Sequence, residues 1–204
     1  MRHLPRFAAA LLALAALHAP AAEWSGGGAQ ARAARPVTWN DLARTPWIAD
    51  GRDDAPLKVY VFMDANCKFC TKFWSDARPW VQSGKVQLRH VMVGVIAPSS
   101  AGKAATLLLD PDPSRRLASF EGAHAFAVAR MMAGGEHHSL DDPRLPPTGR
   151  IPPRIAQAIA DDERLMLALG MRGTPGIVRR GPDGRLIARA GVARDDLPLL
   201  LGPP

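Results

Sequence analysis

The strongest hydrophobic pattern in the chain is a continuous apolar run followed by a segment with helical spacing. Residues 57–63, LKVYVFM, are mostly β-branched and aromatic, which is typical of a strand buried on both faces. The next segment places apolar side chains on one helical face, at positions 70, 73, 74, 77, 80 and 81. Pro79 is expected to kink this helix or loosen its last turns. Residues 86–96 repeat the strand pattern, so together these segments predict a βαβ unit.

The flanking regions complete an α/β pattern. Before the first strand, 37–56 predicts a short amphipathic helix and a turn. Residues 99–133 and 151–169 have helical spacing, and the polar, Pro-rich loop 134–150 between them predicts no regular structure. GIVRR, the turn GPDG and RLIARAG predict a β-hairpin, followed by a short helix near ARDDLPLLLG.

The first 22 residues have the pattern of a secretory signal peptide. Arg2, His3 and Arg6 precede the apolar run 7–17, and small residues follow at 19–21. This run is shorter than the ~20 residues that span a bilayer, so we expect an exported protein without a membrane anchor. Residues 23–45 are rich in Gly, Ala and Arg and predict a flexible lead-in, with the domain at 46–204.

The charge adds little to this picture. The formal net charge of +7 is spread along the chain, which favours acidic partners only weakly. No basic block with interleaved aromatic residues is present, so we expect no nucleic-acid partner.

The only two cysteines, Cys67 and Cys70, are separated by two residues. A secreted domain that depended on disulfides would carry several pairs, and so short a loop would stabilise the fold little. Cys67 lies at or near the predicted helix start, where unpaired N–H groups and the helix dipole favour a thiolate. Lys68 adds a neighbouring cation. Cys70 is one turn further in, on the apolar face, so the pair predicts an exposed nucleophile and a shielded resolving thiol.

Two other interpretations of this pair remain open at this point. A purely structural pair is one. A metal site is the other, either zinc with about four ligands or copper recruiting Met131 and Met132. The histidines available as further ligands are His90, His124, His137 and His138. None has a spacing that pairs naturally with the cysteines.

A second motif, MRGTPGIV, lies just before the predicted hairpin. Pro175 cannot continue a helix, and an X-Pro bond is where a cis peptide is inexpensive. In a cis arrangement Thr174 would turn its backbone toward the cysteine pair and offer hydrogen bonds to an extended polypeptide. An ordinary trans proline opening an edge strand is the alternative.

The order of these motifs resembles the thioredoxin-like catalytic domain of the periplasmic disulfide isomerases DsbC and DsbG, and more closely the DsbG branch. ARPWVQSGKVQL, which generic thioredoxins lack, carries much of the similarity. The resemblance covers 46–110, loosens through a helical insertion at about 97–165, and returns at DDERLMLALGMRGTPGIV. It implies a thioredoxin-like fold, Cys67 as attacking and Cys70 as resolving cysteine, and Thr174-Pro175 as the cis-proline loop that binds substrate.

The resemblance also sets expectations about partners. The substrates would be cysteines of exported proteins in the periplasm, no dissociable cofactor is needed, and a DsbD-type membrane reductase would supply electrons to a reduced form. Two departures matter. Lys68-Phe69 stands where the family typically has Pro-Tyr, which changes the pKa values that set the reduction potential. The family's N-terminal dimerisation domain also has no counterpart in 22–45, so we expect a monomer.

Overall fold

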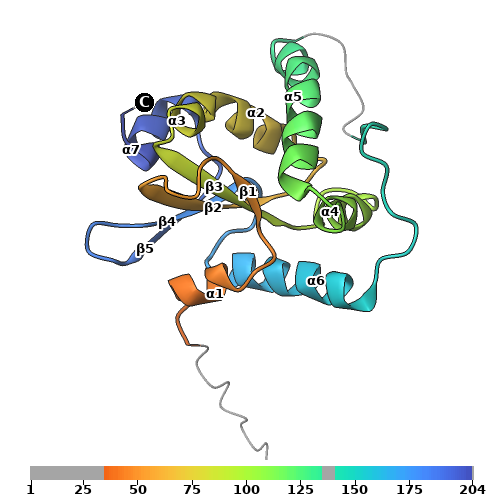
Figure 1. The fold of residues 1–204 in the computed structure, drawn as a ribbon, viewed down its shortest axis with the longest axis horizontal. Coiled ribbons are helices and arrows are strands. Elements are labelled where there is room, and N and C mark those ends of the chain that lie inside the picture. The colour runs from red at the N-terminus through yellow and green to blue at the C-terminus, as the bar shows by residue number, and fades with distance from the viewer. Residues whose placement is uncertain (1–34, 135–140, 204) are drawn as a thin grey trace, which may run out of the picture. The chain divides into compact units, whose positions relative to one another are not determined.

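Five strands form one mixed sheet at the centre of the computed structural model, which describes residues 35–134 and 141–203. The strands are β1 (Ile48–Asp50), β2 (Leu57–Met63), β3 (Val86–Met92), β4 (Gly176–Arg180) and β5 (Leu186–Ala190). Their order is β1-β3-β2-β4-β5, with β2 and β3 parallel and every other pair antiparallel (Figure 1). The predicted central strand is confirmed at both of its ends.

The helices follow the predicted pattern. They are α1 (Trp39–Ala43), α2 (Lys68–Asp76), α3 (Arg78–Gln82), α4 (Ser100–Leu108), α5 (Pro113–Met132), α6 (Pro153–Ala168), the 3-10 helix η1 (Arg194–Asp196) and α7 (Leu197–Leu201). Pro79 is expected from the sequence to kink the helix or loosen its last turns. In the structure the helix is broken in two: α2 ends at Asp76, and α3, which contains Pro79, begins two residues later. The segment predicted as helical over 99–133 consists of α4 and α5 with a turn between them.

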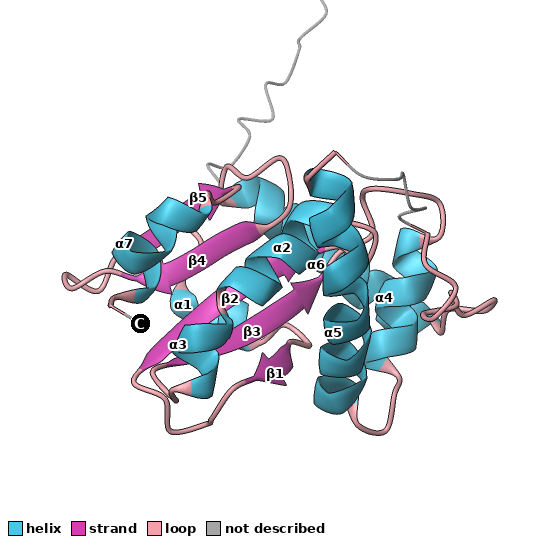
Figure 2. Ribbon diagram, turned by 90° about the horizontal axis from the view of Figure 1, so that it is seen from above, coloured by secondary structure: helices cyan, strands magenta, loops and turns pink. Residues whose placement is uncertain are grey.

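The two faces of the sheet have separate cores. One core combines β1, β2, β3 and β4 with α2, α3, α4, α5 and α7, and the other lies between the sheet, α1 and the last part of α6. α6 contributes to both, through Ile159 to the first core and Met166 to the second. Figure 2 looks onto the first face, with α2 and α3 in front of the strands. Helix α2, which carries both cysteines, therefore packs against the sheet and against α5.

Two features near the start of the domain differ from the prediction. The segment 37–56, predicted as a short helix and a turn, also contains β1, a short edge strand that pairs antiparallel with β3. The compact unit takes in residues from Pro36 onward, ten before the expected boundary at 46, because Leu42 of α1 is fully buried in the second core. The predicted signal peptide and most of the lead-in lie outside the described residues.

Loop 141–150 is irregular, as predicted, but it is firmly attached. Lys103 of α4 is completely buried, and its Nζ donates to the Asp142 backbone carbonyl at 3.0 Å and pairs with Asp141 at 2.8 Å. Leu145 of the loop is also completely buried. Burying a charged lysine requires such partners, so the loop is part of the folded unit.

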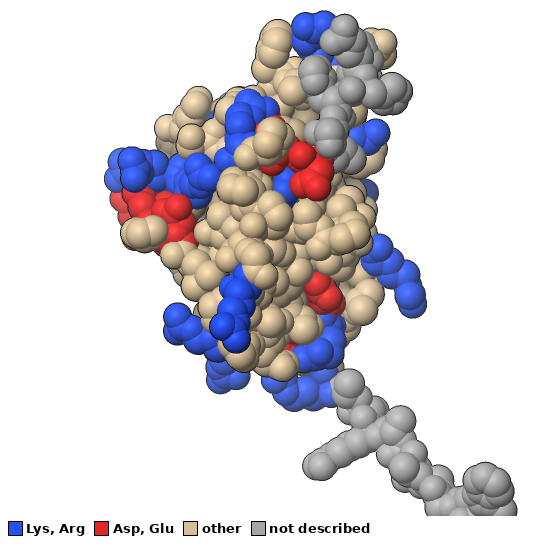
Figure 3. Space-filling model, turned by 90° about the vertical axis from the view of Figure 1, so that its right-hand side faces the viewer, with Lys and Arg blue, Asp and Glu red and all other residues tan. Residues whose placement is uncertain are grey.

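Positive charge lies in separate groups on one face of the molecule. Figure 3 shows Lys and Arg side chains gathered toward the edges of one face, with acidic groups among them and a large uncharged area between. Within the residues that the structure describes, no helix is long and apolar enough to cross a membrane.

Candidate active site

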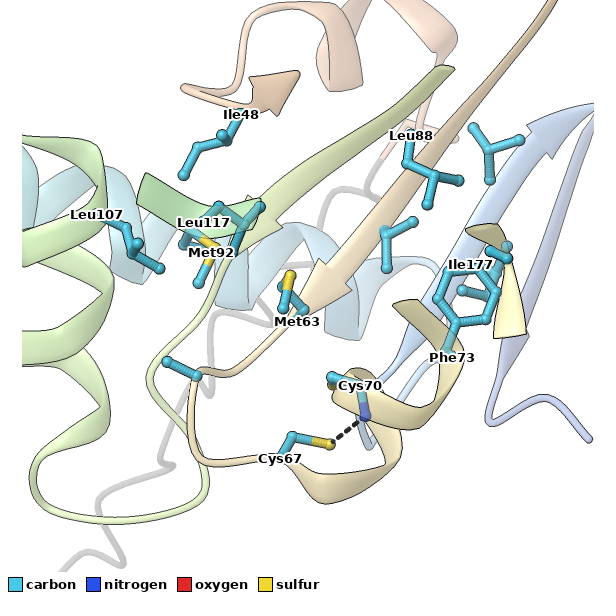
Figure 4. Close-up of a cluster of buried hydrophobic side chains, with 14 of the residues drawn as sticks. Ile48, Met63, Cys67, Cys70, Phe73, Leu88, Met92, Leu107, Leu117 and Ile177 are labelled. Atoms are coloured by element: carbon cyan, nitrogen blue, oxygen red, sulfur yellow. Dashed lines mark hydrogen bonds between the residues drawn. The ribbon is translucent and has the colours of Figure 1, made fainter. Parts of the chain in front are cut away.

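Cys67 occupies the N-cap position of α2, after the short loop that follows the central strand β2. Its backbone is extended, and its Sγ accepts a hydrogen bond from the Cys70 backbone N–H at 3.3 Å (Figure 4). A side chain that accepts from the third residue of the helix satisfies one of the free N–H groups at that end. The reactive sulfur of the pair is thus also the cap of the helix that carries it.

The two thiols are free and have opposite electrostatic surroundings. Hydrogen bonding from the Cys70 side chain, with Thr174 and backbone N–H groups adding to it, lowers the pKa of Cys67 to about 7, although burial opposes the shift. Burial, reinforced by Cys67, raises the pKa of Cys70 well above its usual value. Near neutral pH, Cys67 is partly thiolate while Cys70 keeps its proton, which separates the roles of nucleophile and proton-bearing partner.

The Thr174-Pro175 segment faces the first cysteine. The peptide bond between the two residues is cis, and the Thr174 carbonyl oxygen accepts from the Cys67 thiol at 3.4 Å. The Pro175 carbonyl is held in turn by the Gly191 N–H at 2.8 Å, which ties the loop to the end of the hairpin. Residues 107 positions apart therefore meet at one sulfur atom.

A buried carboxylate braces the loop between β2 and α2. One oxygen of Asp64 accepts the backbone N–H groups of Val95 and Ile96 at 2.8 and 2.9 Å. The other accepts the Asn66 N–H and the Ser100 hydroxyl, both at 2.8 Å. A carboxylate with four donors holds its loop rigidly, because charge-assisted hydrogen bonds are the strong ones.

A cluster of charged and polar side chains lies behind α2. Arg78, at the start of α3, donates to Asp50 of β1 at 3.0 Å, and His90 of β3 lies 3.2 Å from the same carboxylate. The guanidinium also stacks over the Trp74 ring, 4.0 Å from its centroid. Glu121 of α5 is completely buried beside this cluster.

Comparison with known proteins relates the chain to thiol:disulfide interchange proteins named DsbG. No family model matches the chain. The thiol:disulfide interchange protein DsbG of Pseudomonas aeruginosa is 39% identical over 166 residues, covering 81% of this chain and 59% of the relative. DsbG of Escherichia coli is 36% identical over 154 residues, covering 76% of this chain and 56% of the relative.

The chain is similar to DsbG over about four fifths of its own length. It spans a little under three fifths of the length of these two DsbG relatives. Solved structures agree in fold. Proteus mirabilis ScsC in a compact conformation has a TM-score of 0.57 at 20% identity, over 78% of this chain and 73% of that chain. A thioredoxin-like oxidoreductase from Silicibacter pomeroyi has a TM-score of 0.56 at 18% identity, over 79% of this chain and 94% of that chain. The fold is thioredoxin-like.

Of the two residues between the cysteines, Phe69 is exposed and Lys68 is half-buried. Phe69 is 52% exposed, and the Lys68 Nζ lies 5.2 Å from the centroid of its ring. The Phe69 backbone N–H, rather than its ring, contributes to lowering the pKa of Cys67, after the larger effect of Cys70. An exposed aromatic ring beside the reactive sulfur is available to a polypeptide bound there.

Two of the four histidines considered as metal ligands are engaged with other side chains. His90 contacts Asp50, and His124 lies 2.8 Å from Asp142, so neither approaches the dithiol through a described contact. Over 35–134 and 141–203, no group of three or more His, Cys, Asp and Glu side chains is arranged to hold a metal ion. His137 and His138 fall outside the described residues.

Sequence reasoning missed the buried polar groups around the dithiol. Asp64 lies in the short connection before Cys67, and its role depends on N–H groups about thirty positions away. Glu121 did carry a signal, because it occupies a core-facing position of the helix between Leu117 and Val128. A charged residue on the apolar face of a helix indicates a special environment.

Proposed function

We propose that this chain performs thiol–disulfide exchange on cysteines of exported proteins in the periplasm, with Cys67 as nucleophile and Cys70 as resolving thiol. The observation that carries the proposal is the Cys67 sulfur: it caps α2, has a pKa lowered to about 7, and lies 3.4 Å from the Thr174 carbonyl. The DsbG relatives, named thiol:disulfide interchange proteins, support the same chemistry.

The exchange takes place in two steps. The Cys67 thiolate attacks one sulfur of a substrate disulfide, and the other substrate sulfur leaves as a thiolate and takes a proton. Cys70 then loses its proton and attacks the Cys67 sulfur of the mixed disulfide, which releases the second substrate thiol. Burial of Cys70 keeps it from reacting with outside disulfides and reserves it for this second step.

The substrate would lie as an extended segment against Thr174-Pro175. Strand-like pairing with backbone groups fits a protein that acts on many sequences, because it does not depend on particular side chains. The exposed Phe69 ring next to the dithiol supports contact with apolar segments of such a polypeptide.

Trapping of the mixed disulfide tests this function. A Cys70→Ser variant should accumulate a one-to-one mixed disulfide with a peptide that carries a disulfide bond, releasing the other peptide sulfur as a thiol, whereas Cys67→Ser should accumulate none. The wild-type protein should interconvert fully between dithiol and Cys67–Cys70 disulfide in glutathione buffers. Adduct formation by the Cys67→Ser variant at the rate of the Cys70→Ser variant would refute the assigned roles.

The proposal includes a monomeric protein that is recharged by a DsbD-type membrane reductase when it acts in reduced form. The DsbG resemblance supports the reductase. Sedimentation of the purified protein tests the oligomeric state, and reduction by a purified DsbD-type domain tests the partner. The reduction potential fixes the direction: a strongly oxidising couple donates disulfides, and a markedly more reducing one accepts them.

A further inference from the structure

Two exposed apolar residues are neighbours in the segment that follows β3. Val95 is 45% exposed and Ile96 is 48% exposed, and over the described residues no other two large exposed apolar side chains are adjacent in the sequence. Single apolar residues on a surface are ordinary, so the significance of this pair depends on what lies next to it. The exchange mechanism above uses neither residue.

The order of the strands brings this segment to the dithiol. β3 and β4 are the two neighbours of β2 and lie on opposite sides of it. β3 is parallel to β2 and β4 is antiparallel to it, so the loops after β2, after β3 and before β4 leave the sheet at the same edge. The loop that leads to Cys67 is the middle one, with Thr174-Pro175 on one side and Val95-Ile96 on the other.

One buried carboxylate joins two of these loops directly. Asp64 lies in the loop that leads to Cys67. One of its oxygens accepts the Val95 and Ile96 backbone N–H groups at 2.8 and 2.9 Å. The other accepts the Asn66 N–H at 2.8 Å. Figure 4 shows the segment after β3 running beside the loop of the reactive sulfur, as these contacts require. The apolar pair and that loop are thus fixed to the same group.

The backbone of the apolar segment is already occupied. Four consecutive N–H groups, from residue 94 to residue 97, donate to side-chain oxygens: those of Glu163 for the first, Asp64 for the next two and Ser100 for the last. A bound polypeptide therefore cannot pair with these donors as a strand would. The segment presents two branched apolar side chains on a fixed backbone, and such a surface binds with little cost of ordering.

We propose that Val95 and Ile96 form an apolar specificity site, which binds apolar side chains of the substrate polypeptide on one flank of its reacting cysteine. The inference rests on the proposed exchange function and specifies its substrates. The reaction itself supplies the occupant, because a polypeptide joined to the Cys67 sulfur has to pass over the neighbouring loops. Contact with the pair is then intramolecular and needs little affinity of its own. The Thr174-Pro175 side tolerates many sequences, and the Val95-Ile96 side selects among them.

The experiment uses symmetric peptide disulfides and protein with Cys70→Ser, in which the reaction stops at the mixed disulfide. The Cys67 thiolate attacks one peptide sulfur and forms the Cys67–peptide disulfide, and the second peptide copy leaves as a thiolate that takes a proton. Four peptides carry two leucines or two asparagines, which are similar in shape, on the N-terminal or the C-terminal flank of the cysteine. Mass spectrometry follows the rate of adduct formation.

On one flank, the leucine peptide should react about tenfold faster than the asparagine peptide, which corresponds to about 1.4 kcal/mol. On the other flank the two rates should agree within about twofold, because pairing there is with backbone groups. The ratio of two rates in one protein cancels any change in the reactivity of Cys67. Adding Val95→Thr and Ile96→Thr should lower the tenfold ratio to below about threefold. Threonine keeps the β-branched shape, and the bonds to Asp64 involve only backbone N–H groups.

Leu199→Thr is the matched control. Leu199 is 73% exposed, and its carbonyl accepts from Arg179, which lies opposite Val59 toward the start of β2, away from the dithiol. The control should keep the tenfold ratio. If the double variant does not fold, Val95→Thr and Ile96→Thr alone should each lower the ratio by about threefold.

The inference is overturned by a ratio that stays above threefold in the double variant, by unchanged ratios in both single variants, or by equal ratios on the two flanks. If no peptide forms an adduct through Cys67, the proposed exchange function fails and this inference fails with it. If all four peptides form adducts at equal rates, exchange stands and only the apolar specificity site is lost.

Discussion

Replacement of Asp50 by Asn tests whether the charged cluster behind α2 holds the active-site helix in place. Asp50 and Arg78 are 11% and 19% exposed, and they join the end of β1 to the start of α3. Despite burial, hydrogen bonds from His90 and Arg78 keep the pKa of Asp50 well below its usual value. Removing one partner leaves the guanidinium buried without its counter-charge, which typically costs 3–5 kcal/mol, so we expect a loss of roughly 3 kcal/mol.

Urea unfolding at pH 7 measures this loss. The matched control is Asp54→Asn, which breaks the Arg52–Asp54 pair, where both side chains are 69% exposed. Solvent screens such a pair, so the control should leave the free energy of unfolding nearly unchanged. If Asp50→Asn lowers the free energy of unfolding by less than about 1 kcal/mol, this buried pair does not anchor α3 to β1 as inferred.

The same variant has a defined pH dependence. Because the folded-state pKa of Asp50 is lowered, its stabilising contribution is complete above the unfolded value of roughly 4 and is lost as the pH falls below it. The stability difference between wild type and Asp50→Asn should therefore be constant from pH 5 to 7 and shrink below pH 4. A difference that persists undiminished at pH 2 would mean that the side-chain shape, and not the charge, stabilises the fold.

Three further results are expected from other parts of the molecule. Alkylation of wild type by iodoacetamide should modify Cys67 ahead of the other cysteine, with a rate that rises about tenfold per pH unit and levels off near pH 7, as peptide mass spectrometry can follow. Gly102→Ala should lose roughly 1–3 kcal/mol in urea unfolding, because its Cβ would lie 2.6 Å from that of Pro147, whereas Gly149→Ala, with open space around it, should not. Burial raises the pKa of Asp162 to about 7, so the free energy of unfolding of wild type falls as the pH rises from roughly 4 to 7. The Asp162→Asn variant should therefore be more stable than wild type by roughly 2–4 kcal/mol at pH 7 and little changed at pH 4. Equal stability of the two proteins at pH 7 would contradict this.

The elements that the sequence predicted well have strong local signals. The run LKVYVFM is apolar throughout, and the dithiol helix has one apolar face and a proline that ends it. β1 was missed because it has only three residues and is a strand only through its pairing with β3. No periodicity can be read from so short a segment.

The dithiol could be located from spacing alone, but its electrostatic setting could not. Asp50, Arg78 and His90 come from three elements, and their contact depends on the sheet order. The same holds for Glu121, which lies more than fifty positions after Cys67 in the sequence. Such groups follow from the tertiary fold, so a single sequence gives at most the hint of a charge on an apolar helix face.

The capping role of Cys67 makes the first turn of α2 a natural reporter of oxidation state. In the dithiol form its sulfur accepts the Cys70 N–H, and a thiolate is a better acceptor than a sulfur that has formed a disulfide. Each round of the proposed exchange therefore weakens and restores a single amide hydrogen bond at the helix end. The hydrogen-exchange rate of that amide should follow the redox state of the protein, while the amides bound to Asp64 stay protected throughout.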